Sequence, residues 1–310
     1  NEAAVHTVQY RTLASQKPEL SSGVKKLIER VERQRELYLS LCEEINSEDH
    51  PAFAPPPFSR NDPAGAARAA RQWLALGAAK SFDDYRRAVE AKGILVFRSN
   101  GYAGKWQIAK ESPILGFSLY DQRCPVIVVK KARWETQQTF TLMHELGHLL
   151  LHRASSIDDA ADLSAPHGEE RQANSFAGHL LVPDEWLLQI QDGDRPDDVQ
   201  RYDDWLKPQR MQWGVSGEVI LRRLLDSGRL SQADYMAYRA HIRSMPVPED
   251  ASGSRSYRYR EPRHIFGEPF VKTVIGAFSA RRITALKACA YLDGLKLTHL
   301  HQLERHLASL

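Results

Sequence analysis

The sequence Phe-Thr-Leu-Met-His-Glu-Leu-Gly-His-Leu-Leu-Leu-His, residues 140–152, decides the fold of this chain. Apolar residues lie on nearly every side of a helix drawn through it, which predicts a helix buried in the centre of a domain. His144 and His148 are four residues apart and therefore share one face of that helix. Burying two imidazoles and the Glu145 carboxylate without partners costs free energy. Hydrogen-bonded core histidines with an ion-paired glutamate would offset this cost, but we favour a bound metal ion.

The two histidines supply half of a tetrahedral site, and their spacing on one helix is typical of zinc ligands. Glu145 lies beside the ligand face, where it can act as a general base without occupying the metal. Gly147 keeps that surface low, so that a strand or a substrate can approach. A third ligand is expected on the next helix, where Glu169 and Glu170 lie about 50° to either side of the apolar stripe. Periodicity does not choose between these two glutamates.

The surrounding sequence predicts an α+β domain. Short runs rich in β-branched and aromatic residues predict a small antiparallel sheet over residues 94–97, 114–120 and 126–130. Capping residues and apolar periodicity predict helices over residues 62–76, 81–92, 135–152 and 168–181. The loop between the last two helices carries Asp158, Asp159 and Asp162. We interpret it as a solvated connection, with a substrate-selecting lid as the alternative.

Helical segments are also expected on both sides of this domain. An amphipathic helix over 23–45 either packs against the body of the protein or mediates dimerisation. A proline-rich spacer ends near residue 58, and near the C-terminus one helix capped by Ser279 and another over 298–307 are expected. These features predict four regions, at residues 1–58, 59–190, 191–246 and 247–310.

Composition argues against several classes of protein. The 42 basic and 39 acidic residues leave a net charge of +3. This charge is too small to indicate a nucleic-acid partner through an overall positive electrostatic field. No apolar run reaches the roughly 18 residues of a membrane span, and no signal peptide is visible. Cys42, Cys124 and Cys289 are far apart and outside any CxxC spacing, as expected for reduced thiols in a cytoplasmic protein.

A second motif follows the first. Residues 170–183 contain Glu170-x-x-Ala173-Asn174-x-Phe176-Ala177 and then Leu180-Leu181-Val182-Pro183. With these two motifs in this order, the chain resembles the ImmA/IrrE family of bacterial and phage zinc metallopeptidases, most strongly over residues 62–183. It departs from that family at Thr139, where relatives often have a basic residue. The resemblance implies a zincin-like fold and selects Glu170 as the third zinc ligand, beside His144 and His148.

The resemblance also implies an activity. The expected function is that of a zinc-dependent endopeptidase that cuts a specific intracellular protein, such as a repressor or a toxin or antitoxin, with Glu145 as general base. The alternative is a non-catalytic antitoxin or transcription regulator that uses the same fold to recognise its partner. Relatives commonly carry an upstream helix-turn-helix, and we expect such a segment before Asn1.

Weaker candidates lie near the motifs. Asn174, one turn after Glu170, can orient a ligand by hydrogen bonding or simply pack in the core. His179 is a candidate for contact with substrate or with a developing oxyanion. His152 is expected to end its helix and interact favourably with the helix dipole, or to extend the ligand face.

A possible DNA-binding element lies further along the chain. Residues 209–229 resemble a helix-turn-helix with its turn at 214–216, but the second helix begins with Glu218-Val219-Ile220-Leu221. A helix that reads a DNA groove should present polar residues near its start. We therefore favour a structural role for this unit and leave DNA binding as the alternative.

Overall fold

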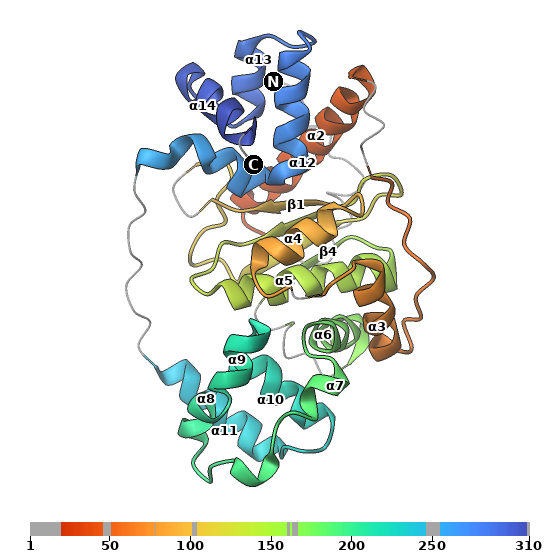
Figure 1. The fold of residues 1–310 in the computed structure, drawn as a ribbon, viewed down its shortest axis with the longest axis vertical. Helices are drawn as coiled ribbons and strands as arrows, with labels where there is room; N and C mark the ends of the chain where they lie inside the picture. Colours follow the sequence, from red (N-terminus) through yellow and green to blue (C-terminus); the bar gives the residue numbers. More distant parts are fainter. Residues whose placement is uncertain are drawn as a thin grey trace.

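The computed structural model describes residues 20–45, 51–77, 79–100, 104–159, 162, 167–245 and 255–308. A sheet lies at the centre of this part of the chain, between two layers of helices (Figure 1). In the spatial order β1-β3-β2-β4, its strands are β1 (Leu95–Arg98), β3 (Val126–Val129), β2 (Ile114–Leu119) and β4 (Ser156–Asp159). The predicted α+β class with helical flanks is confirmed.

The sheet is mixed, whereas the sequence pattern had suggested a wholly antiparallel one. β2 runs antiparallel to both of its neighbours, but β1 pairs with β3 in parallel, with Leu95 opposite Val126. β1 and β2 follow each other in the sequence but are not neighbours in the sheet, because β3 lies between them. Short apolar runs predict that strands exist, but they do not specify which edges pair.

β4 lies within the segment expected to be a solvated connection, and this expectation was wrong. Ser156, Ile157 and Asp158 are buried, and the strand pairs with β2 at the edge of the sheet. Successive side chains of a strand point to opposite faces. Ile157 accordingly packs in the core above the sheet, while Asp158 faces the helices below it.

The predicted helices around the motifs form the layer below the sheet. They are α3 (Pro63–Trp73), α4 (Phe82–Glu90), α5 (Glu135–Gly147), the π-helix η1 (His148–His152) and α6 (Gly168–Leu181). Asp62 and Ser81 cap α3 and α4 through their side chains, as their positions predicted. A Cβ on Gly147 would lie 3.1 Å from the Phe176 ring and 3.2 Å from Ala173 Cα. The close approach that this glycine permits is therefore that of α6, not of a strand or substrate.

The layer above the sheet joins helices from the two ends of the chain. It contains α2 (Ser22–Glu44), η5 (Arg255–Arg260), α12 (Glu261–Ser279), α13 (Ala285–Tyr291) and α14 (Leu297–Ala308) (Figure 1). The apolar stripe of α2 packs within the chain, where Tyr38 stacks on Phe270 of α12 with ring centroids 6.1 Å apart. Ser279 ends α12 instead of capping a helix, and Thr284 caps α13 in its place. The expected cap was wrong because the apolar sequence before Ser279 is itself helical.

A helical unit follows α6 at the opposite end of the molecule (Figure 1). Its helices are α7 (Asp184–Leu187), η3 (Asp192–Asp194), η4 (Val199–Arg201), α8 (Tyr202–Trp205), α9 (Lys207–Trp213), α10 (Gly217–Asp226) and α11 (Gln232–Ser244). Gly214 makes the turn between α9 and α10 with φ of 68°, a conformation that favours glycine.

The second helix of this helix-turn-helix-like unit is part of the core. α10 buries Val219, Ile220 and Leu224, and the guanidinium of Arg223 donates to the Val182 carbonyl and pairs with Asp184. Arg223 therefore holds α10 to the end of α6, which is the structural role that the sequence favoured. DNA binding and the four-region division stay predictions. Among the described helices, none combines the length and the apolar character needed to cross a membrane.

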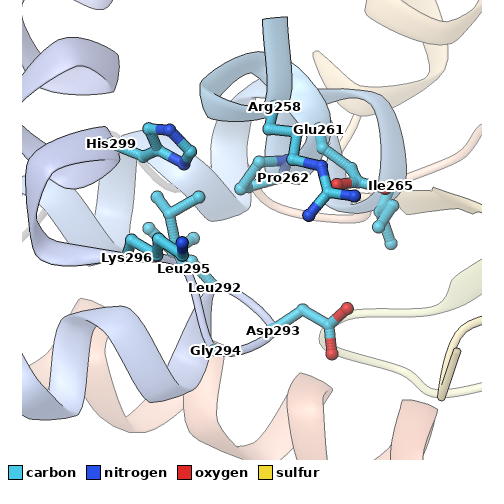
Figure 2. Close-up of a pocket in the computed structure, with 10 residues that line it drawn as sticks. All are labelled: Arg258, Glu261, Pro262, Ile265, Leu292, Asp293, Gly294, Leu295, Lys296 and His299. Carbon is cyan, nitrogen blue, oxygen red and sulfur yellow. The ribbon is translucent and has the colours of Figure 1, made fainter. Parts of the chain in front are cut away.

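A pocket opens in the upper layer, between the start of α12 and the turn from α13 to α14 (Figure 2). Its lining includes side chains of both charges, with Arg258 and Lys296 beside Glu261 and Asp293. None of the polar residues that line it is buried. Mixed, exposed charges do not select one class of ligand, so we assign this pocket no function.

Candidate metal centre

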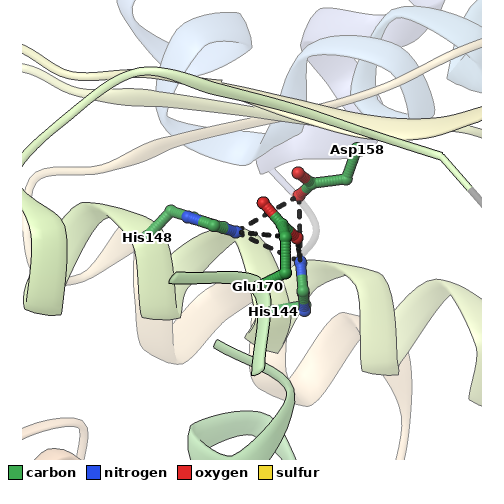
Figure 3. Close-up of side chains that lie close together, drawn as sticks. All are labelled: His144, His148, Asp158 and Glu170. Carbon is green, nitrogen blue, oxygen red and sulfur yellow. Dashed lines mark hydrogen bonds and ion pairs between the residues drawn. The ribbon is translucent and has the colours of Figure 1, made fainter. Parts of the chain in front are cut away.

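α5 and η1 carry the two motif histidines into the core. His144 and His148 are at most 2% exposed, and their Nε2 atoms lie 3.2 Å apart below the sheet (Figure 3). One helix turn separates the two residues, so their side chains project from the same face. The predicted convergence of two imidazoles is therefore present.

The first turn of α6 adds Glu170. Its Oε2 lies 3.3 Å from His144 Nε2 and 3.6 Å from His148 Nε2. Glu169, the other candidate, is exposed and lies outside the cluster. The structure thus brings together the three residues that the sequence and the family resemblance assigned to the metal.

A fourth residue, Asp158, was not foreseen. Its Oδ2 lies 3.1 Å from His144 Nε2 and 3.7 Å from His148 Nε2, and its side chain is only 2% exposed. Ser156 Oγ donates a hydrogen bond of 2.7 Å to the other oxygen, Oδ1. Asp158 lies on a strand with one apolar residue among four. The sequence lacks the run of β-branched and aromatic residues that predicts a strand, so neither β4 nor the burial of Asp158 was expected.

Glu145 lies beside the cluster with its carboxylate against β2. The carboxylate is fully buried, and the polar side chains that it meets include those of Asp158 and Ser118. A Cβ on Gly116 of β2 would lie 2.9 Å from Glu145 Oε1, so only glycine leaves room for this carboxylate. A buried carboxylate beside a second buried carboxylate is costly, which indicates a role other than stability.

The charges in the cluster favour a cation at its centre. Burial alone would lower the pKa of His144, but the Asp158 and Glu170 carboxylates outweigh burial and raise it to about 9. Burial would raise the pKa of Glu170, yet its contacts with His144 and His148 lower it to about 2. The pKa of Glu145 is raised well above its usual range by burial and by the negative charge of Asp158. Without a metal, a proton on His144 supplies the positive charge that these acids favour.

The spacing of the four donor atoms fits a small tetrahedral ion. Zinc with nitrogen and oxygen ligands at about 2.0–2.1 Å has donor atoms about 3.3–3.4 Å apart. The measured separations among the His144, His148, Asp158 and Glu170 donors are 3.1, 3.2, 3.3, 3.6 and 3.7 Å, and all four atoms lie within 4.8 Å of one another. Two imidazoles and two carboxylates also match the ligand preference of zinc.

A chain of hydrogen bonds prepares His148 to bind a metal. Gln172 Oε1 lies 3.0 Å from His152 Nε2, and His152 Nδ1 lies 3.0 Å from His148 Nδ1. The amide oxygen only accepts, so Nε2 of a neutral His152 donates to it and Nδ1 is left to accept from His148. His148 then carries its proton on Nδ1, which leaves the Nε2 lone pair facing the cluster. His152 therefore orients a predicted ligand, a role that its position at a helix end did not reveal.

The two weaker candidates lie outside the cluster of four. Asn174 Nδ2 donates 2.9 Å to the backbone carbonyl of Asp162, so it holds the connection between β4 and α6. His179 Nδ1 contacts the Ser175 carbonyl at 2.8 Å, and its Nε2 lies 3.9 Å from Asp184. Contact of His179 with a substrate stays a prediction.

The fold and the cluster define a zincin-like, metallopeptidase-type domain. Residues 89–225 match the family model Peptidase_M78, described as an IrrE N-terminal-like domain. The matched segment contains all four strands, α5, α6 and the four residues of the cluster. This match supports the resemblance to the ImmA/IrrE family of metallopeptidases that the two sequence motifs predicted. A search of curated proteins found no match to the chain.

Proposed function

We propose that this chain is a zinc-dependent endopeptidase that cleaves one specific protein, such as a repressor or a toxin–antitoxin regulator, within a bacterial or phage regulatory system. The observation that carries the proposal is the meeting of two imidazoles and two carboxylates at tetrahedral spacing beside the buried Glu145. The match to a metal-dependent peptidase family supports the same reaction class. The three free, buried thiols agree with the expected cytoplasmic location.

In this proposal His144, His148 and Glu170 hold the zinc ion. When bound, zinc supplies a Lewis acid that polarises the peptide carbonyl and stabilises negative charge. Glu145 accepts the proton of the attacking water and returns it to the leaving amide nitrogen. Its burial between α5 and β2 keeps this carboxylate oriented and excludes bulk water from it.

Metal analysis of purified variants tests the ligand assignment. We expect one zinc per chain in the wild type and in Glu145→Gln, because Glu145 is not a ligand. His144→Ala and Glu170→Ala should lose zinc, since each removes one of the metal-binding groups. Equal zinc in the wild type and all three variants would exclude this assignment.

Cleavage is tested by co-expressing the chain with proteins encoded beside it. The wild type should cut its partner in a metal-dependent way, and Glu145→Gln should slow cleavage by about 10²- to 10⁴-fold, the usual contribution of a general base. Equal binding of the partner by both forms, with no cleavage by either, would instead favour the non-catalytic regulator.

A further inference from the structure

We propose that Asp158 is a fourth protein ligand that closes the metal centre in the resting protein, and that β4 must move before a substrate can reach the metal. This inference rests on the proposed zinc site and adds a regulatory state to it. In that state, Asp158 occupies the position that an attacking water or a peptide carbonyl would need.

The first argument is the shape of the cluster. His144, His148, Glu170 and Asp158 each turn one donor atom towards the same space, and these four atoms all lie within 4.8 Å of one another (Figure 3). Its distances to the two histidine nitrogens, 3.1 and 3.7 Å, fall in the same range as those of Glu170, 3.3 and 3.6 Å. Catalytic zinc sites have three protein ligands and an open fourth position, whereas sites with four protein ligands are closed.

The second argument is the way in which Asp158 is held. Ser156 donates its hydroxyl to Oδ1, which leaves Oδ2 for the cluster. Ile157 anchors the strand from the other face by packing in the core above the sheet. Two carboxylates also neutralise the charge of a divalent ion, so the closed state is electrostatically complete.

The third argument is Glu145, which separates a closed catalytic site from a purely structural one. A structural zinc site with four protein ligands has no use for a third acidic side chain buried beside it. Glu145 is nevertheless fully buried beside the Asp158 carboxylate, and Gly116 leaves the space that its carboxylate needs. Retention of this unfavourable group is explained if the site opens and Glu145 then acts as a base.

The position of β4 makes opening feasible. Among the residues that the structure describes, β4 is an edge strand of four residues that pairs only with β2, and their register shifts between Ile114 and Gly116. Displacing it breaks no other strand pairing. The movement withdraws Asp158 and uncovers the edge of β2, to which an extended peptide can add as a strand.

The test uses the full chain with cobalt in place of zinc, because the visible spectrum of cobalt reports its ligands. Acetohydroxamate serves as the probe, since it binds a metal only where a coordination position is open. We expect Asp158→Ala to bind acetohydroxamate at least tenfold more tightly than the wild type does. Its affinity for zinc, measured against a chelator, should be at least tenfold weaker. Asp158→Asn has nearly the same shape, lowers the risk of misfolding and should change both values in the same directions.

Asp159→Ala is the matched control, because it removes the same charge from the next residue of the strand. It should leave both affinities within about twofold of the wild type. The proposal is overturned if both Asp158 variants match the wild type in zinc affinity and in acetohydroxamate binding. Failure of the zinc site itself would appear differently, as a wild type that binds no stoichiometric metal.

Discussion

Replacing His152 with alanine should weaken zinc binding without removing any predicted ligand. His152 Nδ1 is the acceptor that keeps the proton of His148 on Nδ1, across 3.0 Å, and its own Nε2 is fixed by Gln172 across another 3.0 Å. Without this acceptor, His148 is free to carry its proton on Nε2, which is the atom that faces the metal. Loss of a group that orients a metal ligand costs about 10- to 100-fold in affinity, or about 1.4–2.7 kcal/mol.

The size of the effect should depend on which member of the chain is changed. Gln172→Ala leaves His152 in place and only frees its tautomer, so a smaller loss than that of His152→Ala is expected. His301→Ala, on the exposed face of α14, makes the same change far from the cluster in the fold and should have no effect. Zinc affinity is measured by competition with a chromogenic chelator. A change below twofold for His152→Ala, with zinc content retained, would refute the argument about the tautomer of His148.

Three further predictions concern stability. Gly116→Ala would place a Cβ 2.7 Å from Thr141 Cγ2 and 2.9 Å from the Val128 carbonyl oxygen, and should lower the free energy of unfolding by about 1–3 kcal/mol. Gly193→Ala is the control, because its Cβ meets no atom within 4 Å and the free energy of unfolding should not change. Equal melting temperatures for the two variants would contradict this steric argument. Burial raises the pKa of Glu90 to about 7 despite Arg86, so the folded state retains a proton that the unfolded state loses above about pH 4.5. The contribution of Glu90 to the free energy of unfolding therefore falls by up to about 3 kcal/mol as the pH rises to about 7. Glu90→Gln does not titrate, so the difference between its melting temperature and that of the wild type should shift in favour of the variant between pH 5 and 8. Chelation of the metal should lower the melting temperature, because a ligand present at 1,000 times its Kd stabilises the folded state by about 4 kcal/mol. An unchanged melting curve after verified metal removal would show that metal binding does not stabilise the fold.

Local patterns predicted the elements that carry the motifs. Apolar periodicity and capping residues located α5 and α6, and the four-residue spacing of His144 and His148 predicted that their side chains converge. These features depend on residues within one or two helix turns of each other. Choosing Glu170 over Glu169 required the family resemblance, since both lie equally close to the apolar stripe.

The features that sequence reasoning missed depend on distant partners. β4 contains Ser156, Ile157 and two aspartates, and it becomes a strand because β2, about forty residues earlier, offers a free edge. Asp158 is buried only as a result of that pairing. The parallel pairing of β1 and β3 has the same origin, because nothing within either run specifies its neighbour.

The π-helical turn at His148–His152 also has a consequence for chain length. The Arg153 amide donates to the His148 carbonyl five residues earlier, so this turn contains one residue more than an ordinary α-helical turn. Deleting one of Leu149, Leu150 or Leu151 would place the following histidine three residues after His148 instead of four, which changes its angle around the helix axis and its height along that axis. The imidazole would then no longer lie at its present position beside the His148 ring, although every polar residue of the centre had been kept. Insertions and deletions in this apolar triplet would therefore be harmful in a way that substitutions of leucine by similar side chains are not.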